Sequence, residues 1–343
     1  MTTIEDREQT MGAAGKSPAP APTQHTVRSL LQQNRLWLGT LAFFLVLLAI
    51  FIVINPQVFL NPAIYRSIML TVPIAIFLVV PAVFVVTAGE IDLSFPSVMG
   101  LSAWAFAIVV QSGYDPFLGM LACIALGSAM GFAVGGLVVY GNLSSLVATL
   151  GMNFLLRGLI MIISGGRSIA VPELRETTIH SIVAGRLFDI PMQMIWAVAF
   201  VIFCAFLYNR HRFGAHVHHV GDNPDSAEQM GISTRRVRVS VFAFMGLGAS
   251  LAGIVSLMIN FTWWPTTGEG FLLVALAALF VGGTPAWGGI GTVIGGAIGA
   301  VIVSFMETGV VAAGMDGFFV QFFSGLIIIL ALLGHRFHGG RVR

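Results

Sequence analysis

The feature that most constrains this chain is a series of long apolar runs separated by short polar connections. A helix needs about 20 apolar residues to cross about 30 Å of hydrocarbon. Hydrophobic residues make up 57% of the 343 residues and charged residues only 9%, whereas a soluble domain carries about 25% charged residues. A water-soluble surface cannot be built from this composition. The runs lie at 37–54, 67–88, 97–111, 116–140, 144–164, 191–208, 239–260, 271–283, 292–306 and 317–334.

We therefore predict an all-α integral membrane protein with about ten transmembrane helices. Its parts are a polar N-terminal segment at 1–36, a transmembrane domain at 37–334 and a C-terminal tail at 335–343. Cytoplasmic connections are enriched in Lys and Arg, and this rule predicts that both termini are cytoplasmic. The outside then holds Arg66, Arg167, Arg175 and Arg186, and the inside holds Arg7, Lys16, Arg28, Arg35, Arg210, Arg212, Arg235, Arg236, Arg238, Arg336, Arg341 and Arg343.

Two pairs of spans are joined by stretches rich in Gly and Pro. The second and third spans meet at 89–96, and the eighth and ninth meet at 282–291. Interrupted segments at corresponding positions in two halves point to the pathway of a transporter, so we expect interrupted helices in two related halves. Ordinary turns at the membrane surface would give the same pattern, and the sequence leaves that alternative open.

Ionisable and polar side chains near these spans are candidates for a substrate pathway, because they are costly inside a membrane. Glu90 and Asp92 border the interrupted second span, although Asp92 and Ser94 would also serve as a cap for the third helix. Arg157 is the basic residue well inside a span, with Asn153 four positions earlier on the same helical face. Arg157 would suit interhelical carbonyls as well as a substrate, and in both cases it should face protein.

Further pathway candidates lie on the predicted outer side, before the eighth span. Trp263 and Trp264 offer ring faces that suit the C–H groups of sugars, although Trp is also common in the interface belts of membranes. Thr266 and Glu269 follow in a stretch with two glycines. Glu269 would alternatively contact a protein that docks on the outer side.

The longest internal hydrophilic segment is 209–238, on the predicted cytoplasmic side. Asn223 suits an N-cap, Pro224 suits the first helical position and Gly231 suits a left-handed stop, which together predict a helix of about seven residues. A helix this short is marginal in water. It needs a surface to rest on, which is either the membrane domain or a partner protein.

Other classes of function find little support. Residues 12–17 (GAAGKS) resemble half of a phosphate-binding loop, but Thr10 stands where the first Gly belongs, and Lys16 is the only lysine. The net charge of +2 is too small to indicate a nucleic-acid partner. Cys123 and Cys204 lie in apolar runs and are interpreted as packing residues. No metal site or bound cofactor is expected, because no Cys or nearby carboxylate completes a ligand set for His211, His216, His218 and His219.

Four motifs, in order, resemble those of the ABC importer permeases for ribose, xylose and arabinose. GEIDLSFPS at 89–97 is similar to that family's GGIDLSVGS, and residues 149–167 match TLxxxxxxRGL followed by SGGR. GDNPDSAEQMGIS at 221–233 is similar to the coupling-helix signature. PTTGEGF at 265–271 and GGTPAWGGIG at 282–291 are similar to PTAGTGY and GGTSLFGGxG. The resemblance covers about residues 65 to 335.

This resemblance implies a transport subunit rather than an enzyme, placed in a bacterial cytoplasmic membrane. It implies a permease dimer, expected to be a homodimer, with cytoplasmic ATP-binding subunits that use the ATP. A periplasmic or lipid-anchored binding protein would deliver a small polyhydroxylated solute, either a monosaccharide or a polyol. The positions that the resemblance assigns to ATPase coupling are Asn223, Pro224, Ala227, Glu228 and Gly231.

Departures from the family pattern leave the solute open. Glu90 replaces a Gly, Phe95 and Pro96 replace Val and Gly, and 271–276 lacks the acidic residue that the family often carries. Nucleosides, a furanosyl signalling molecule and branched-chain amino acids therefore remain alternatives. A secondary transporter would place more ionisable groups in its spans than Arg157 alone, and a membrane-embedded enzyme would need a convergent catalytic set.

Overall fold

The computed structural model describes residues 35–312 and 314–339, which are mostly helical. The phosphate-loop-like residues 12–17 and the end of the predicted tail, 340–343, lie outside the described residues. The described residues from 36 onward belong to one compact unit, and the description below concerns that unit.

Helices occupy each of the predicted apolar runs within the described residues. Those long and apolar enough to cross a membrane are α5 (Pro62–Thr87), α7 (Pro116–Tyr140), α8 (Ser145–Ser164), α10 (Met192–Asn209), α13 (Thr234–Asn260) and α15 (Val293–Ala312). Shorter apolar stretches lie in α3 (Arg35–Ile54), α6 (Phe95–Gln111), α14 (Phe271–Val281) and α16 (Phe318–Gly339). The architecture is that of an all-α, multi-pass membrane protein.

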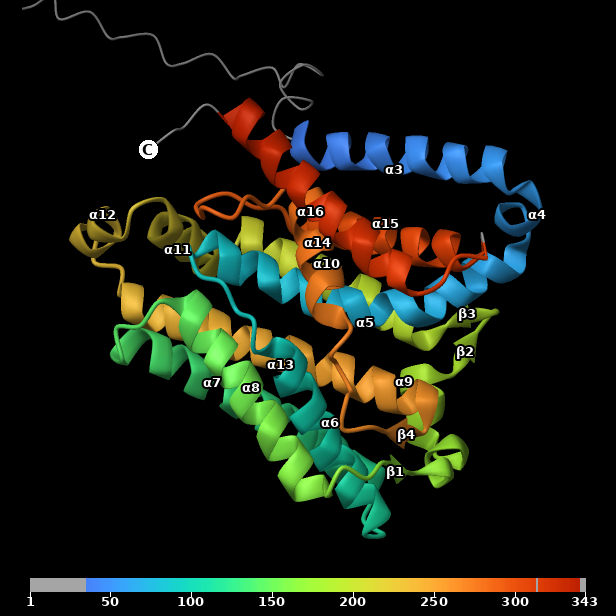
Figure 1. Cartoon of the computed structure of the whole chain (residues 1–343). Helices are drawn as coiled ribbons and strands as arrows, with labels where there is room; N and C mark the ends of the chain where they lie inside the picture. Colours follow the sequence, from blue (N-terminus) through green and yellow to red (C-terminus); the bar gives the residue numbers. More distant parts are fainter. Residues whose placement is uncertain (1–34, 313, 340–343) are drawn as a thin grey trace, which may run out of the picture. The chain divides into compact units, whose positions relative to one another are not determined.

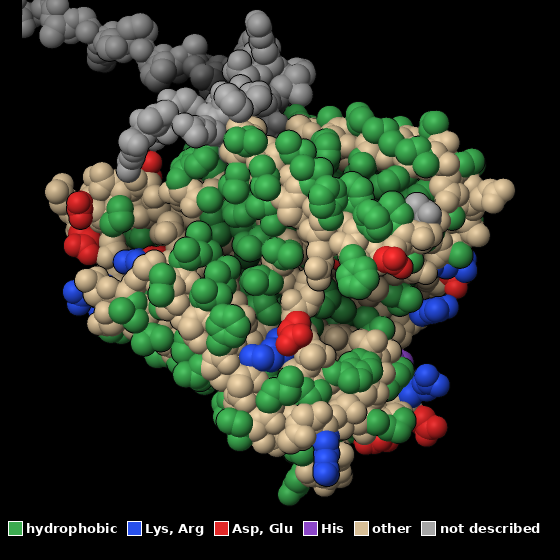
Figure 2. All heavy atoms as spheres, in the orientation of Figure 1, with side chains coloured by type: hydrophobic (Ala, Val, Ile, Leu, Met, Phe, Trp, Pro, Cys, Tyr) green, Lys and Arg blue, Asp and Glu red, His purple; other side chains and the backbone are tan. Residues whose placement is uncertain are grey.

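The long helices divide into buried and peripheral ones. In α5, 83% of the most apolar window is buried, against 22% in α8 and in α10. The exposed side chains of the peripheral helices are large and apolar, as in Phe154 and Ile162 of α8. Figure 2 shows hydrophobic side chains over much of one face, with most charged side chains toward its edges and a few near its centre.

The close packing of α7 on α13 depends on glycine (Figure 1). Gly127, Gly131 and Gly135 recur every four residues along α7. A Cβ atom at Gly131 would overlap the carbonyl oxygen of Phe242 on α13. Small residues allow helices in a membrane to approach closely, where van der Waals contact drives association.

Short elements mark two ends of the bundle (Figure 1). The α12 end carries α11 (Arg212–Asp222) and α12 (Pro224–Gln229). The β end carries β1 (Ile169–Ala170), which pairs antiparallel with β4 (Thr262–Trp263) and places Ile169 opposite Trp263. The other short elements are α4 (Pro56–Phe59), the 3-10 helix η1 (Pro172–Glu176), α9 (Thr178–Ala184) and the pair β2 (Arg186–Leu187) and β3 (Ile190–Pro191).

The histidine-rich part of the hydrophilic segment 209–238 is helical. Residues 212–222 form α11, because Phe213, Val217 and Val220 recur at helical spacing. Val217 and Val220 are buried. The ring of His218 lies with Nδ1 3.1 Å from the carbonyl oxygen of Gly289.

Two helix ends also differ from the prediction. α15 continues beyond residue 306 to Ala312 and therefore includes Glu307, so the expectation that Arg157 alone is ionisable within a span is wrong. α16 continues beyond residue 334 to Gly339. In both cases the helix continues through polar residues that lower the local hydropathy but do not break helical hydrogen bonding.

Candidate functional site

A stripe of polar side chains runs along one face of α8. Ser145, Thr149, Asn153 and Arg157 follow one another at intervals of four residues, which places them on the same face of the helix. We call these four residues the α8 stripe. The sequence prediction included Asn153 and Arg157 but missed the other two, although the same spacing continues back to the start of α8.

Residues 88–94, between α5 and α6, have no helical structure and are called segment 88–94. Its backbone follows the α8 stripe, since the N–H of Ile91 donates to Oγ of Ser145 at 3.2 Å and that of Leu93 donates to Oγ1 of Thr149 at 3.0 Å. Backbone N–H groups outside helices need such partners when they are buried. The α8 stripe thus stabilises the non-helical connection between α5 and α6.

The stripe continues to hold the first turns of α6. Oγ of Ser97 donates to Oδ1 of Asn153 at 2.6 Å. Because Ser97 lies in the first turn of α6, this contact fixes the start of the helix against the middle of α8.

Asp92 and Ser94 form a local turn before α6. Oδ1 of Asp92 accepts hydrogen bonds from the backbone N–H of Ser94 at 2.7 Å and from its hydroxyl at 2.6 Å. Both side chains are buried. Ser94 is the N-cap residue of α6, but its side chain makes no capping hydrogen bond, so the Asp92 carboxylate holds the turn before the helix rather than the helix end.

Glu90 is paired with a basic residue at the start of α13. Its carboxylate oxygen Oε1 accepts from Nε of Arg238 and also contacts Nη2 of the same guanidinium. The Glu90 side chain is only 4% exposed. Removing one partner of a buried ion pair costs about 3–5 kcal/mol. Glu90, which stands where the family pattern has a glycine, is therefore strongly bound to Arg238.

Arg157 holds the chain between β4 and α14, which we call turn 264–270. Its Nη1 donates to the carbonyl oxygen of Pro265 at 2.5 Å and to that of Thr267 at 3.2 Å. Its Nε lies 3.3 Å from Oε1 of Glu269. The Arg157 side chain is 14% exposed, which confirms that it faces protein.

Turn 264–270 is a second non-helical stretch beside the α8 stripe. Arg157 lies seven residues before the end of α8, which is about 10 Å along the helix at 1.5 Å per residue. Because Arg157 binds the turn, the turn lies beside α8 at this level rather than at the end of the helix. The 11 residues of α14 start directly after the turn and extend for about 16 Å, roughly half of the hydrocarbon thickness. The stretch 282–291 instead packs at the α12 end, where the N–H of Gly289 donates to the carbonyl of Thr87 at 2.8 Å.

The predicted aromatic residues differ in accessibility. Trp263 is 1% exposed, and its Nε1 donates to the carbonyl of Gly100 at 2.9 Å, so its ring lies neither in an interface belt nor on an open pathway. Trp264 is 45% exposed. Thr266 and Glu269 are also exposed, and together these three side chains form the accessible side of the turn.

The short helix in 209–238 matches its prediction closely. Oδ1 of Asn223 accepts from the N–H of Ser226 at 3.0 Å, Pro224 is the first helical residue, and Gly231 adopts a positive φ of 79°. Oε1 of Glu228 accepts from the hydroxyl of Thr234 at 2.6 Å. The cap and this last contact fix both ends of α12.

Only part of α12 is available to a partner. Ala227 is 1% exposed, so its methyl group packs against its own chain. Asp225, Gln229 and Met230 are exposed, with Met230 at 62%. α12 therefore rests on the membrane domain and presents its other face outward.

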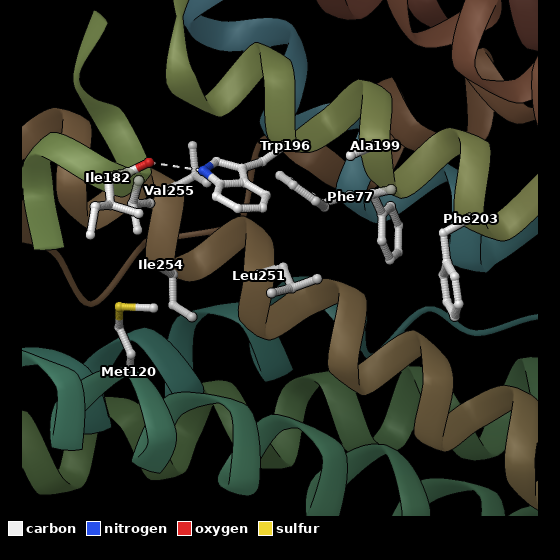
Figure 3. Close-up of a pocket in the computed structure, with 11 residues that line it drawn as sticks. Phe77, Met120, Ile182, Trp196, Ala199, Phe203, Leu251, Ile254 and Val255 are labelled. Atoms are coloured by element: carbon white, nitrogen blue, oxygen red, sulfur yellow. Dashed lines mark hydrogen bonds between the residues drawn. The ribbon is translucent and has the colours of Figure 1, made fainter. Parts of the chain in front are cut away.

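A separate groove of about 450 Å³ opens between α10, α13 and neighbouring helices (Figure 3). Apolar side chains line it, including Phe77, Phe200 and Leu251. The Nε1 of Trp196 donates to the carbonyl of Ile182 at 2.8 Å. The groove offers no polar group for a hydrophilic solute, and it is distinct from the α8 stripe.

Comparison with known proteins agrees with this arrangement. The family described as branched-chain amino acid transport system / permease component matches residues 64–332. Ribose import permease protein RbsC of Escherichia coli (strain K12) is 30% identical over 316 residues, which cover 91% of this chain and 98% of that protein.

Two further relatives align over similar lengths. Autoinducer 2 import system permease protein LsrC of Yersinia enterocolitica is 32% identical, with 91% of this chain and 84% of that protein covered. L-arabinose ABC transporter permease protein AraH of Azospirillum brasilense is 29% identical, with 92% and 91% covered. The chain therefore belongs to this family of ABC importer permeases.

Proposed function

We propose that this chain is the membrane-spanning subunit of an ATP-driven importer for a small polyhydroxylated solute, most simply a monosaccharide or polyol. RbsC and AraH, whose names specify ribose and L-arabinose, align over more than nine tenths of their length. LsrC supports autoinducer 2 as a second candidate, since it is 32% identical. A binding protein outside the membrane would deliver the solute.

The observation that carries this proposal is α12, a helix of six residues. A helix this short does not persist alone in water, yet it is capped, seated through Ala227 and tied to α13 through Glu228. Its exposed face, with Asp225, Gln229 and Met230, would dock in an ATP-binding subunit. That partner would bind and hydrolyse the ATP, and this chain would bind no cofactor.

The solute pathway is proposed to run along turn 264–270 and the α8 stripe. Arg157 and Glu269 supply hydrogen-bond donors and acceptors that suit hydroxyl groups. Trp264 offers an exposed ring for a sugar face, and Thr266 adds a hydroxyl. Asn153 lies one helical turn away on the same stripe, toward segment 88–94.

The proposed topology has ten crossings in two related halves, with the α12 end in the cytoplasm and both termini on that side. This orientation places Arg210, Arg212 and the basic start of α13 inside, as expected for cytoplasmic connections. Two copies of the chain would form a homodimer in a bacterial cytoplasmic membrane.

The test is uptake by proteoliposomes that contain the chain, its ATP-binding subunit and its binding protein. We expect ATP-dependent accumulation of a pentose or hexose, and the chain alone should accumulate nothing. A panel with ribose, arabinose, allose, autoinducer 2, a nucleoside and leucine would identify the solute class. Concentration of solute by the chain alone, or uptake that ignores ATP, would contradict the proposal.

A further inference from the structure

We propose that the ion pair between Arg238 and Glu90 is the link through which displacement of α12 reaches segment 88–94. This inference rests on the proposed function, because it requires an ATP-binding subunit that docks on α12 and displaces it. Glu90 and Arg238 are positioning residues in this role, since neither needs to touch the solute.

The first step of the link joins α12 to α13. The hydroxyl of Thr234, the first residue of α13, donates to Oε1 of Glu228 at 2.6 Å. The N–H of Ile232 donates to the carbonyl of Ala227 at 3.0 Å. With Ala227 buried as well, α12 and the start of α13 are expected to move as one unit.

The second step joins α13 to the interruption. Arg238 lies four residues after Thr234, and therefore on the same face of α13. Its guanidinium contacts the Glu90 carboxylate through both Nε and Nη2. A planar guanidinium fixes direction as well as distance in such a pair, so a shift of α13 would carry Glu90 with it.

The third step concerns what holds segment 88–94 on either side of Glu90. Before it, the end of α5 is packed against α11, and a Cβ atom at Gly221 would overlap the carbonyl oxygen of Thr87. After it, Ile91 and Leu93 are bonded to the α8 stripe. Segment 88–94 is thus held at both ends, and Glu90 between them is the residue through which a movement of α13 would reach it.

Neighbouring basic residues do not share this position. Arg235 and Arg236 are exposed, whereas the Arg238 side chain is 35% exposed and that of Glu90 only 4%. Arg236 therefore provides a matched control on the same turn of α13. Because Glu90 is buried, the Arg238 charge is its specific counterpart.

The experiment compares variants in proteoliposomes with the ATP-binding subunit and binding protein, and measures solute transported per ATP hydrolysed. We expect Glu90→Gln and Arg238→Gln to keep ATP hydrolysis but to lower this ratio about tenfold, a usual size for coupling between sites. Arg236→Gln should leave it unchanged. The exchange Glu90→Arg with Arg238→Glu should recover at least half of the lost ratio.

Thermal unfolding of each variant separates coupling from folding. If a Gln variant fails to assemble, Glu90→Asp and Arg238→Lys replace it, since each retains the charge and alters only the geometry. The proposed link would be wrong if the Glu90 and Arg238 variants transported as much solute per ATP as the wild type. It would also be wrong if Arg236→Gln lowered this ratio by the same factor. Recovery of thermal stability without recovery of the ratio in the exchanged pair would also overturn it. Absence of ATP-driven uptake by the wild-type complex would instead contradict the proposed function.

Discussion

Segment 88–94 and turn 264–270 are both non-helical stretches beside the α8 stripe, but they are held in different ways. Glu90 in the segment is 4% exposed and pairs with Arg238 of α13. Glu269 in the turn has a side chain that is 51% exposed and pairs with Arg157 of α8. The carboxylate of the first ion pair is buried, whereas the carboxylate of the second is half-exposed.

This difference suits the two stretches to the different tasks proposed for them. An ion pair with a buried carboxylate retains a fixed geometry and is screened less by salt, which suits the proposed transfer of movement from α13. An ion pair with a half-exposed carboxylate can exchange partners with a solute at small cost. The predictions below test this contrast from the largest expected effect to the smallest.

The largest effect is expected for Arg157→Met. The change removes the donor to the carbonyls of Pro265 and Thr267, and each unsatisfied buried group costs about 1–3 kcal/mol. Turn 264–270 should lose its fixed position, with a lower unfolding temperature and near-complete loss of uptake. Arg157→Lys should recover part of the stability because it restores one charged donor. If the Met variant were as stable as the wild type, contacts other than those of Arg157 would hold the turn.

A smaller effect is expected for Thr149→Val, which keeps the side-chain shape but removes the acceptor for the N–H of Leu93. The loss should be about 1–2 kcal/mol, measured by thermal or denaturant unfolding in detergent. Thr308→Val on α15 is the control, because that hydroxyl donates to the carbonyl of Ser304 in its own helix. Equal losses in both variants would argue against a special role for the α8 stripe.

The smallest effect on stability is expected for Glu269→Gln. A half-exposed ion pair contributes about 0–1 kcal/mol, so unfolding should change little. Uptake should show a raised KM with a similar maximal rate, whereas Glu90→Gln should lower the transport ratio at any solute concentration. If Glu269→Gln lowered the transport ratio as Glu90→Gln does, the contrast between the two stretches would fail.

The long helices and α12 were predictable because their signals are local. Apolar length located the helices, and the Asn223 cap with Pro224 and Gly231 located α12 within one residue. A break between helices near 89–96 was also predicted, and in the structure it spans 88–94 because α6 already begins at Phe95.

The contacts that give these elements their roles were not predictable. Arg238 and Glu90 are separated by 148 positions in sequence, and no local rule pairs them. The position of turn 264–270 against α8 depends on Arg157, which belongs to a different helix. Thr149 was missed for a simpler reason, since a hydroxyl inside an apolar run does not change the hydropathy pattern.

The most direct test of the central claim is the side of the membrane that α12 faces. Met230→Cys places a thiol at a position that is 62% exposed, and the native Cys123 and Cys204 are buried and contribute little background. A membrane-impermeant maleimide should label this thiol in inside-out vesicles and should leave it unlabelled in intact cells. The bound ATP-binding subunit should protect the thiol from labelling in the vesicles. Labelling in intact cells would contradict the account.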